Sequence, residues 1–254
     1  MGGDSFQMSK FFVEEGAVRG DTITITGDDV NHIRKVLRLR TGEVITVCDG
    51  KGMDYRAEIE QLEAQYVSAR VVGVRESGTE PPIEVVLFQG LPKSDKMDYI
   101  IQKTIELGIS KIIPVITERT VVKIDNKKDA ENKRVRWQRI SLEAAKQCNR
   151  GMVPIVEAPV SFEKALELLK EYELCMIPYE KERNTKLKSL VKADPDQRKI
   201  AVFIGPEGGF SEEEIERAEK QGVKPVTLGS RILRTETAGI AVLSILMYEL
   251  GDVG

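Results

Sequence analysis

The chain has 254 residues, of which 41% are hydrophobic and 31% charged, and its formal net charge is -3. This composition is typical of a globular protein and excludes a disordered chain, and the length allows one large or two ordinary domains. The net charge argues against indiscriminate nucleic-acid binding but leaves room for a local basic face. The longest apolar run is interrupted by Ser244 and ends at Glu249, short of the ~20 residues that a membrane span needs.

The cysteines and the single histidine do not form a metal-binding pattern. Cys48, Cys148 and Cys175 are far apart, and with His32 they provide no ligand spacing, so we expect no metal. Scattered thiols and the lack of a secretory signal indicate a reducing, cytoplasmic location. Residues 1–7 resemble an added leader, which places the native start at Met8.

The first part of the chain reads as short strands separated by glycines. Strands are expected at residues 11–13, 22–26, 44–48, 55–59 and 67–74. One helix, residues 28–39, is expected to be capped by Asp28 or Asp29. This pattern predicts a small β-barrel rather than an enzyme core.

A polar, proline-containing linker at residues 75–82 marks the domain boundary, and strands and helices alternate after it. Strands are expected at residues 83–88, 112–116, 155–156, 174–177, 200–204 and 223–228, and helices at residues 95–107, 132–149, 161–172, from Ser211 onward, and 238–250. This alternation predicts an α/β domain, with a mainly parallel sheet covered by helices on both faces.

The strand at residues 200–204 runs into a Gly-Pro-Glu-Gly-Gly turn, after which Ser211 and Glu214 fit a capping box. Such a turn lets backbone amides approach a ligand closely. Carboxylates at Glu207 and residues 212–214 would repel a polyphosphate, and the turn lacks the P-loop and dinucleotide motifs. A phosphate-free nucleoside or a cationic ligand suits the turn better, although the helical glutamates alone are explained by the helix dipole.

A second glycine turn follows the next strand. Gly229 and Ser230 end the strand at 223–228, and Arg231 and Arg234 precede an almost wholly apolar helix. Two glycine turns after consecutive parallel strands can enclose a small molecule at one sheet edge.

The two motifs, IGPEGGFS at residues 204–211 and LGSRILRTETA at 228–238, together resemble the paired motifs of the RsmE family. These SPOUT-superfamily enzymes methylate N3 of a uridine in small-subunit ribosomal RNA with S-adenosylmethionine. The resemblance extends over nearly the whole chain. It implies a PUA-like RNA-binding β-barrel at residues 8–74 and a SPOUT methyltransferase domain with a trefoil knot at residues 83–252. It also implies a homodimer through the apolar last helix, for which a central core helix is the alternative. The implied partner is 16S ribosomal RNA or the assembled small subunit.

With the positions of the turns, the resemblance implies a set of site residues. The cofactor is expected to be held, largely through backbone groups, at Ile177, Pro178, Tyr179, Ile204, Gly205, Glu207, Gly208, Leu228, Gly229, Ile232, Leu233 and Thr237. Arg231 and Arg234 are expected to face RNA phosphate or the uracil oxygens, while Glu236 either pairs an arginine or accepts the proton. RNA contacts are expected from Arg34, Lys35, Arg38, Lys93, Lys96 and Arg150, for each of which ordinary surface charge is the alternative.

The reaction needs an in-line nucleophile held in position, and the N3 proton must leave during attack. Methylation at carbon 5 would instead need a cysteine nucleophile, and no cysteine lies in either glycine turn. Two alternatives stay open: a SPOUT enzyme acting on a ribose 2′-oxygen or a tRNA base, and a non-catalytic RNA-binding factor in ribosome assembly.

Overall fold

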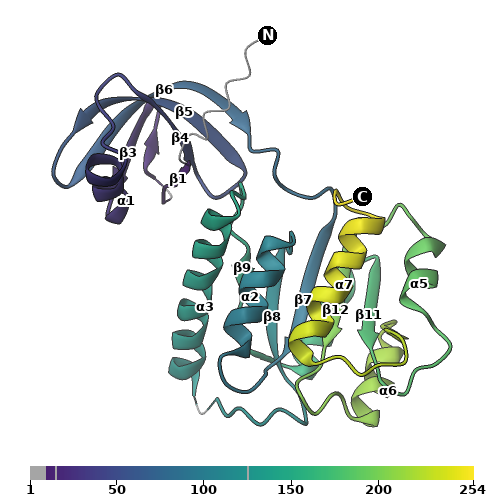
Figure 1. Cartoon of the computed structure of the whole chain (residues 1–254). Helices are drawn as coiled ribbons and strands as arrows, with labels where there is room; N and C mark the ends of the chain where they lie inside the picture. Colours follow the sequence, from purple (N-terminus) through teal and green to yellow (C-terminus); the bar gives the residue numbers. More distant parts are fainter. Residues whose placement is uncertain (1–9, 15, 125) are drawn as a thin grey trace. The chain divides into compact units, whose positions relative to one another are not determined.

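The computed structural model describes residues 10–14, 16–124 and 126–254, so the expectations for residues 1–7 and Met8 lie outside the described residues. The chain forms two compact units (Figure 1). The N-terminal unit comprises the chain up to Glu80 together with Ala145–Val153, and the C-terminal unit comprises Pro81–Ala144 and Pro154–Gly254. The sequence did not indicate that residues 145–153 belong with the first unit.

The N-terminal unit is built on a six-stranded sheet in the order β1-β4-β5-β6-β3-β2. Its strands are β1 (Lys10–Phe12), β2 (Val18–Arg19), β3 (Thr22–Thr26), β4 (Val44–Cys48), β5 (Met53–Leu62) and β6 (Tyr66–Glu76). β1 pairs with β4 in parallel, and the other neighbours are antiparallel. Alternate side chains such as Ile23 and Ile25 point into one apolar core, which gives β3 its period of two.

The predicted helix of this unit is shorter than expected and is capped differently. It consists of α1 (Asp28–Asn31) and a π-helical turn (His32–Val36). Capping by Asp28 or Asp29 is wrong, because Gly27 with φ 75° occupies the N-cap position. Both aspartates instead lie in the first turn, where they complement the helix dipole. The helix does not reach residue 39 because Arg38 adopts a left-handed φ of 55°.

The C-terminal unit alternates strands and helices, as predicted. Its elements are β7 (Glu84–Gly90), α2 (Lys96–Glu106), β8 (Lys111–Ile116), α3 (Lys127–Gln147, whose last three residues belong to the other unit), β9 (Ile155–Val156), β10 (Val160–Ser161), α4 (Phe162–Glu167, continued by a 3-10 turn, Leu168–Glu171), β11 (Leu174–Pro178), α5 (Leu187–Ala193), β12 (Lys199–Ile204), α6 (Glu212–Lys220), β13 (Lys224–Val226) and α7 (Thr235–Glu249). The sheet order is β10-β8-β7-β12-β11-β13, with β9 beside β8, and every pairing is parallel.

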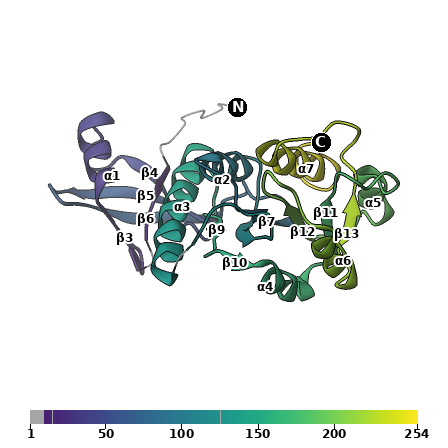
Figure 2. The same cartoon turned by 90° about the horizontal axis from the view of Figure 1, so that it is seen from below.

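Helices cover both faces of this sheet, which confirms the α/β prediction. Figure 2 shows α2 and α7 on one side and α4 and α6 on the other. On the α4 and α6 face, Phe88 stacks on Phe203 at 4.5 Å between ring centroids. On the opposite face, Gly239 of α7 lies close to Leu87 and Ile204.

The end of the chain turns back across the sheet. β13 lies at an edge beside β11, whereas α7 packs against α2, β7 and β12. α7 begins at Thr235, three residues before the predicted start at Ala238. Passage of this segment through a loop, as a trefoil knot requires, stays a prediction. Within the described part of the chain, no helix is long and apolar enough to cross a membrane.

Candidate functional site

The two predicted turns lie at one edge of the sheet. Because the strands are parallel, the loops after β7, β11, β12 and β13 all leave from the same edge. The Tyr179 amide, after β11, donates to the Val226 carbonyl of β13 at 3.0 Å. Glu180 is next to Gly209 of the first turn, since a Cβ on that glycine would lie 3.5 Å from the carboxylate. The three segments expected to surround the cofactor are therefore neighbours.

The Gly-Pro-Glu-Gly-Gly turn is closely packed, so a side chain at either of two of its glycines would crowd its neighbours. A Cβ on Gly205 would lie 3.0 Å from the Gly209 Cα, and one on Gly208 would lie 3.0 Å from the Arg119 Cβ. Gly209 also has a left-handed φ of 67°. Arg119, in the loop after β8, donates from Nη1 to the Gly208 carbonyl at 2.9 Å. Because its glycines have no side chains, the backbone of this turn can pack closely against its neighbours.

The start of α6 fixes this turn from the other end. The predicted capping box is present: the Glu214 amide donates to Ser211 Oγ, and the Ser211 amide donates to the Glu214 carboxylate at 3.0 Å. Glu214 is buried and also accepts from the Glu118 amide at 2.9 Å. Ser211 Oγ donates to the Glu118 carboxylate at 2.6 Å. Glu214 therefore has a structural role, beyond complementing the helix dipole.

The second turn is more open than the first. Gly229 has φ 104°, and no atom lies within 4 Å of the place where its Cβ would be. The Gly229 amide donates to Thr227 Oγ1 at 3.2 Å. Ile232 is 88% exposed, so within a single chain its side chain does not line a closed pocket.

One hydroxyl connects the two turns. Thr235, the first residue of α7, donates from Oγ1 to the Gly205 carbonyl at 2.6 Å. The same oxygen accepts from Nε2 of Gln89, a fully buried residue of β7, at 2.9 Å. Neither Thr235 nor Gln89 was predicted for the site. The predicted threonine was Thr237, which is exposed.

A lysine forms a second connection. Lys96 Nζ lies 2.9 Å from Glu207 in the first turn and 3.4 Å from Glu236 in α7. The Lys93 amide also donates to Glu207 at 3.1 Å. The hydrogen bond to Glu207 is the main reason that the pKa of Lys96 is raised. Burial by itself would raise the pKa of Glu207, but Lys96 and the neighbouring amides outweigh it and lower the pKa, so both groups are charged at neutral pH.

Comparison with known proteins identifies the family. A family model described as an RNA methyltransferase domain matches residues 79–247, and one described as an RNA methyltransferase PUA domain matches residues 25–72. The ribosomal RNA small subunit methyltransferase E of Bacillus subtilis (strain 168) is 36% identical over 249 residues, which is 95% of this chain and 97% of that protein. This chain belongs to the ribosomal RNA small subunit methyltransferase E family.

Solved structures agree with this family. The family's enzyme from Neisseria gonorrhoeae, bound to S-adenosyl methionine, has a TM-score of 0.85 and 34% identity, covering 97% of this chain and 100% of that one. A putative methyltransferase from Legionella pneumophila, in complex with S-adenosylmethionine, has a TM-score of 0.83 and 32% identity, with the same coverage. The prediction of a methyltransferase domain with an N-terminal PUA-like domain is therefore confirmed.

In this family member the residues expected at the cofactor differ in their surroundings. Half-buried at the sheet edge are Pro178, Tyr179, Gly205, Leu228 and Leu233; exposed are Glu207, Gly208, Gly229, Ile232 and Thr237; buried are Ile177 and Ile204. The Ile177 side chain packs in the core under α4 and α6, and that of Ile204 packs against Gly239. These two isoleucines can therefore reach a ligand only through their backbone, the kind of contact expected for most of the site.

The residues expected at the RNA also fall into different environments. Arg34, Lys35 and Arg38 are exposed on the N-terminal unit, and Lys93, Arg231 and Arg234 are exposed on the C-terminal unit. Lys96 is partly buried against its two carboxylates.

Arg150 is wrong as an RNA contact, because it is only 5% exposed and forms an ion pair with Glu80. Glu80 also accepts from the amides of Gly151 and Met152, at 3.0 and 3.1 Å. Burial alone would raise the pKa of Glu80, but Arg150 and these amides outweigh it and lower the pKa. The pair attaches the segment around Gly151 to the end of the linker within the N-terminal unit.

The cysteines are unsuited to act as nucleophiles. Burial raises the pKa of both Cys48 and Cys175 to about 11, so both are neutral thiols at physiological pH. Cys175 lies within β11, and Cys148 lies just after α3, away from the glycine turns in sequence.

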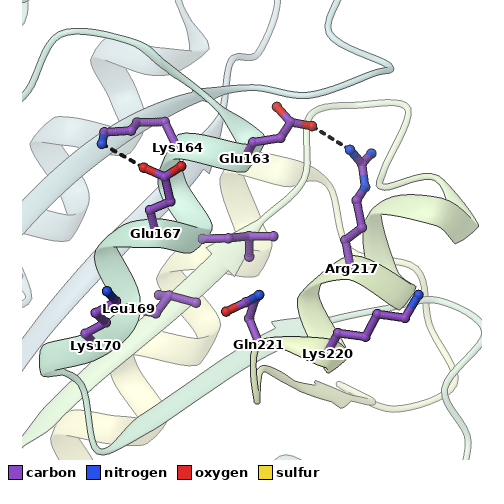
Figure 3. A pocket seen from close by; sticks show the side chains of 9 residues that line it. Glu163, Lys164, Glu167, Leu169, Lys170, Arg217, Lys220 and Gln221 are labelled. Atoms are coloured by element: carbon purple, nitrogen blue, oxygen red, sulfur yellow. Dashed lines mark hydrogen bonds and ion pairs between the residues drawn. The ribbon is translucent and has the colours of Figure 1, made fainter.

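A pocket of about 710 Å³ lies between α4 and α6 (Figure 3). It is lined by Glu163, Lys164, Leu166, Glu167, Leu169, Lys170, Arg217, Lys220 and Gln221. Glu163 pairs with Arg217 at 2.5 Å and Glu167 with Lys164 at 2.8 Å, as the figure shows. None of these residues belongs to the predicted cofactor or RNA sites.

Proposed function

We propose that this protein transfers the methyl group of S-adenosylmethionine to N3 of a uridine in 16S ribosomal RNA. The observation that carries this proposal is the convergence of two glycine turns at one edge of a parallel sheet, where Thr235 joins them. Relatives that span nearly the whole chain are named as small-subunit ribosomal RNA methyltransferases, which supports this substrate class.

The turns suit this cofactor. Gly205 and Gly208 add no side chain of their own to this edge, and half-buried Tyr179, Leu228 and Leu233 supply apolar surface for an adenosine. Glu207 adds negative charge to this edge, which favours a sulfonium and disfavours a polyphosphate. When bound, S-adenosylmethionine supplies an electrophilic methyl group, and the protein supplies position and electrostatics.

On the RNA side, cations are best placed to assist loss of the N3 proton. Arg231 and Arg234 are exposed where the second turn meets α7 and would stabilise negative charge on the uracil oxygens. Lys96 keeps its proton because its pKa is raised, so it is not the base. Glu236 forms an ion pair with Lys96, which supports a structural role for Glu236 rather than a role as proton acceptor.

RNA phosphates are expected on the PUA-like unit. Arg34, Lys35 and Arg38 are exposed in and after its short helix, where they can replace counterions on the backbone. Reversing the charges of Arg34 and Lys35 is expected to weaken RNA binding and to flatten its dependence on salt, while leaving S-adenosylmethionine affinity unchanged.

A second copy of this chain is the proposed partner of α7. α7 is almost wholly apolar, yet Ile245 is 38% and Tyr248 64% exposed. Pairing of two α7 helices would cover these side chains. Light scattering should give a dimeric mass, and Tyr248→Glu should lower it.

Methyl transfer with mapped products tests the proposed function. Purified 16S ribosomal RNA and assembled small subunits are each incubated with labelled S-adenosylmethionine, and the nucleosides are identified by mass spectrometry. We expect the parent protein to form 3-methyluridine. Arg234→Ala should abolish this product, and Gly208→Val should abolish cofactor binding. Products methylated at a ribose 2′-oxygen, or activity only on tRNA, would replace the proposal with the first alternative. Absence of S-adenosylmethionine binding in calorimetry would favour the non-catalytic one.

A further inference from the structure

We infer that Thr235 is a positioning residue that holds the two glycine turns in one cofactor-binding arrangement through a single hydroxyl group. The inference rests on the proposed function, because it assigns to Thr235 the preorganisation of the S-adenosylmethionine site. Thr235 touches neither cofactor nor RNA in this assignment, and it acts through the Gly205 carbonyl.

The Thr235 hydroxyl bonds to a distant segment rather than to its own helix. At a helix start, the side chain that commonly accepts from the first amides is that of the N-cap residue. The N-cap residue of α7 is Arg234, and α7 has no side-chain cap. Thr235 Oγ1 instead donates 2.6 Å to Gly205, thirty residues earlier in the chain. The hydroxyl thus joins one turn to the other.

The surroundings leave this hydroxyl little freedom. Thr235 is 6% exposed, and Gln89 is fully buried. Gln89 Nε2 donates 2.9 Å to the Thr235 oxygen and 2.9 Å to the Gly90 carbonyl. Because the Thr235 oxygen accepts a hydrogen bond from Gln89, the Thr235 hydroxyl can donate only to Gly205 among these partners. A β-branched side chain also has few rotamers, which further fixes the contact.

The carbonyl that receives the hydrogen bond lies at a point where the backbone is tightly packed. A Cβ on Gly90 would lie 2.5 Å from the Pro206 ring, and one on Gly205 would lie 3.0 Å from Gly209. A shift of the Gly205 carbonyl therefore displaces the whole turn that follows it. Since Thr235 directly follows the second turn, loss of its hydroxyl lets the two turns move independently.

The test compares Thr235→Val, which keeps the shape and removes the hydroxyl, with Thr235→Ser, which keeps the hydroxyl. Thr104→Val is the matched control: Thr104 is fully buried and donates 2.7 Å to Ile100 within α2. Calorimetry measures the Kd for S-adenosylmethionine, and hydrogen exchange measures protection of residues 205–209 and 228–234.

We expect Thr235→Val to raise the Kd about tenfold, equivalent to about 1.4 kcal/mol, and to speed exchange in both turns together. Thr235→Ser should stay within about threefold of the parent, and Thr104→Val should keep the parent's Kd and exchange in the turns. The inference is overturned if Thr235→Val binds like the parent, if Thr235→Ser is as weak as Thr235→Val, or if only one turn changes.

A variant that fails to fold does not rescue the inference. In that case Gln89→Met, which removes the donor to the Thr235 oxygen, is measured in the same way, and an unchanged Kd overturns the inference. The proposed function fails separately, if the parent protein neither binds S-adenosylmethionine nor forms 3-methyluridine. If the parent protein binds S-adenosylmethionine and forms 3-methyluridine, and Thr235→Val does so equally well, only the role of Thr235 is refuted.

Discussion

Replacing Gly229 with alanine tests whether the second turn has to keep its backbone conformation for the cofactor. Gly229 has φ 104°, and nothing lies within 4 Å of its would-be Cβ. The substitution therefore adds backbone strain without a collision. Gly222, after α6, has φ 85° and equally open surroundings, and it lies outside the predicted site. Gly222→Ala is the matched control.

A non-glycine residue held in such a region costs on the order of 1–3 kcal/mol. In the free Gly229→Ala protein the turn can relax and relieve this strain, so that binding must restore the original conformation. At about 1.4 kcal/mol per tenfold, the Kd for S-adenosylmethionine should rise by roughly 5- to 150-fold. Gly222→Ala carries a similar strain but should leave the Kd within about twofold of the parent, because Gly222 precedes β13 whereas the predicted turn follows it.

Calorimetric titration with S-adenosylmethionine gives the two Kd values, and thermal unfolding shows whether both variants fold. Each kcal/mol of strain that remains should lower Tm by about 2–4 °C for a domain of this size. Equal S-adenosylmethionine affinities for Gly229→Ala, Gly222→Ala and the parent would refute the reasoning. Equal losses in both variants would refute it as well, since the effect would then be general.

Three further predictions concern other contacts. Lys96→Met removes the cation from beside Glu207 and should lower kcat/KM for methyl transfer about tenfold or more; unchanged kinetics would show that the contact is dispensable. Glu80→Ala leaves Arg150 buried without its carboxylate and should lower the free energy of unfolding by about 3–5 kcal/mol, whereas Glu80→Gln should cost less. Because the pKa of Glu80 is held below its ordinary 4.5, this stabilisation should be complete above that pH and lost as pH falls through the lower folded-state pKa; urea titrations across pH check this. Ser211→Ala should cost about 1 kcal/mol through loss of the helix cap, measured as a lower Tm.

The features that the sequence predicted well are those with a local chemical cause. The capping box follows from Ser211 and Glu214, which are three positions apart. The turn follows from the glycines of the Gly-Pro-Glu-Gly-Gly motif, at positions where a side chain would be crowded or strained. The parallel sheet follows from the alternation of strand and helix patterns. In each case the information lies within one short segment.

The features that were missed depend on partners distant in sequence. Arg150 lies in a basic stretch and resembles a surface residue, but Glu80, seventy positions away, draws it into the interior. Thr235 resembles a residue leading into a helix, and only the folded chain brings its hydroxyl to Gly205. The left-handed Arg38 that ends the first helix also has no local signal, because arginine is not a residue that favours that conformation.

The N-terminal unit includes Ala145–Val153, and this has a consequence for protein synthesis. A nascent chain that has emerged only as far as Glu80 still lacks Arg150, the partner of this half-buried carboxylate, and Met152, which pairs with Lys51. At roughly 5–20 residues per second, the missing segment follows about 4–15 s later. The N-terminal unit is therefore not complete until much of the C-terminal unit has been synthesised. A fragment cut at the linker would lack Ala145–Val153.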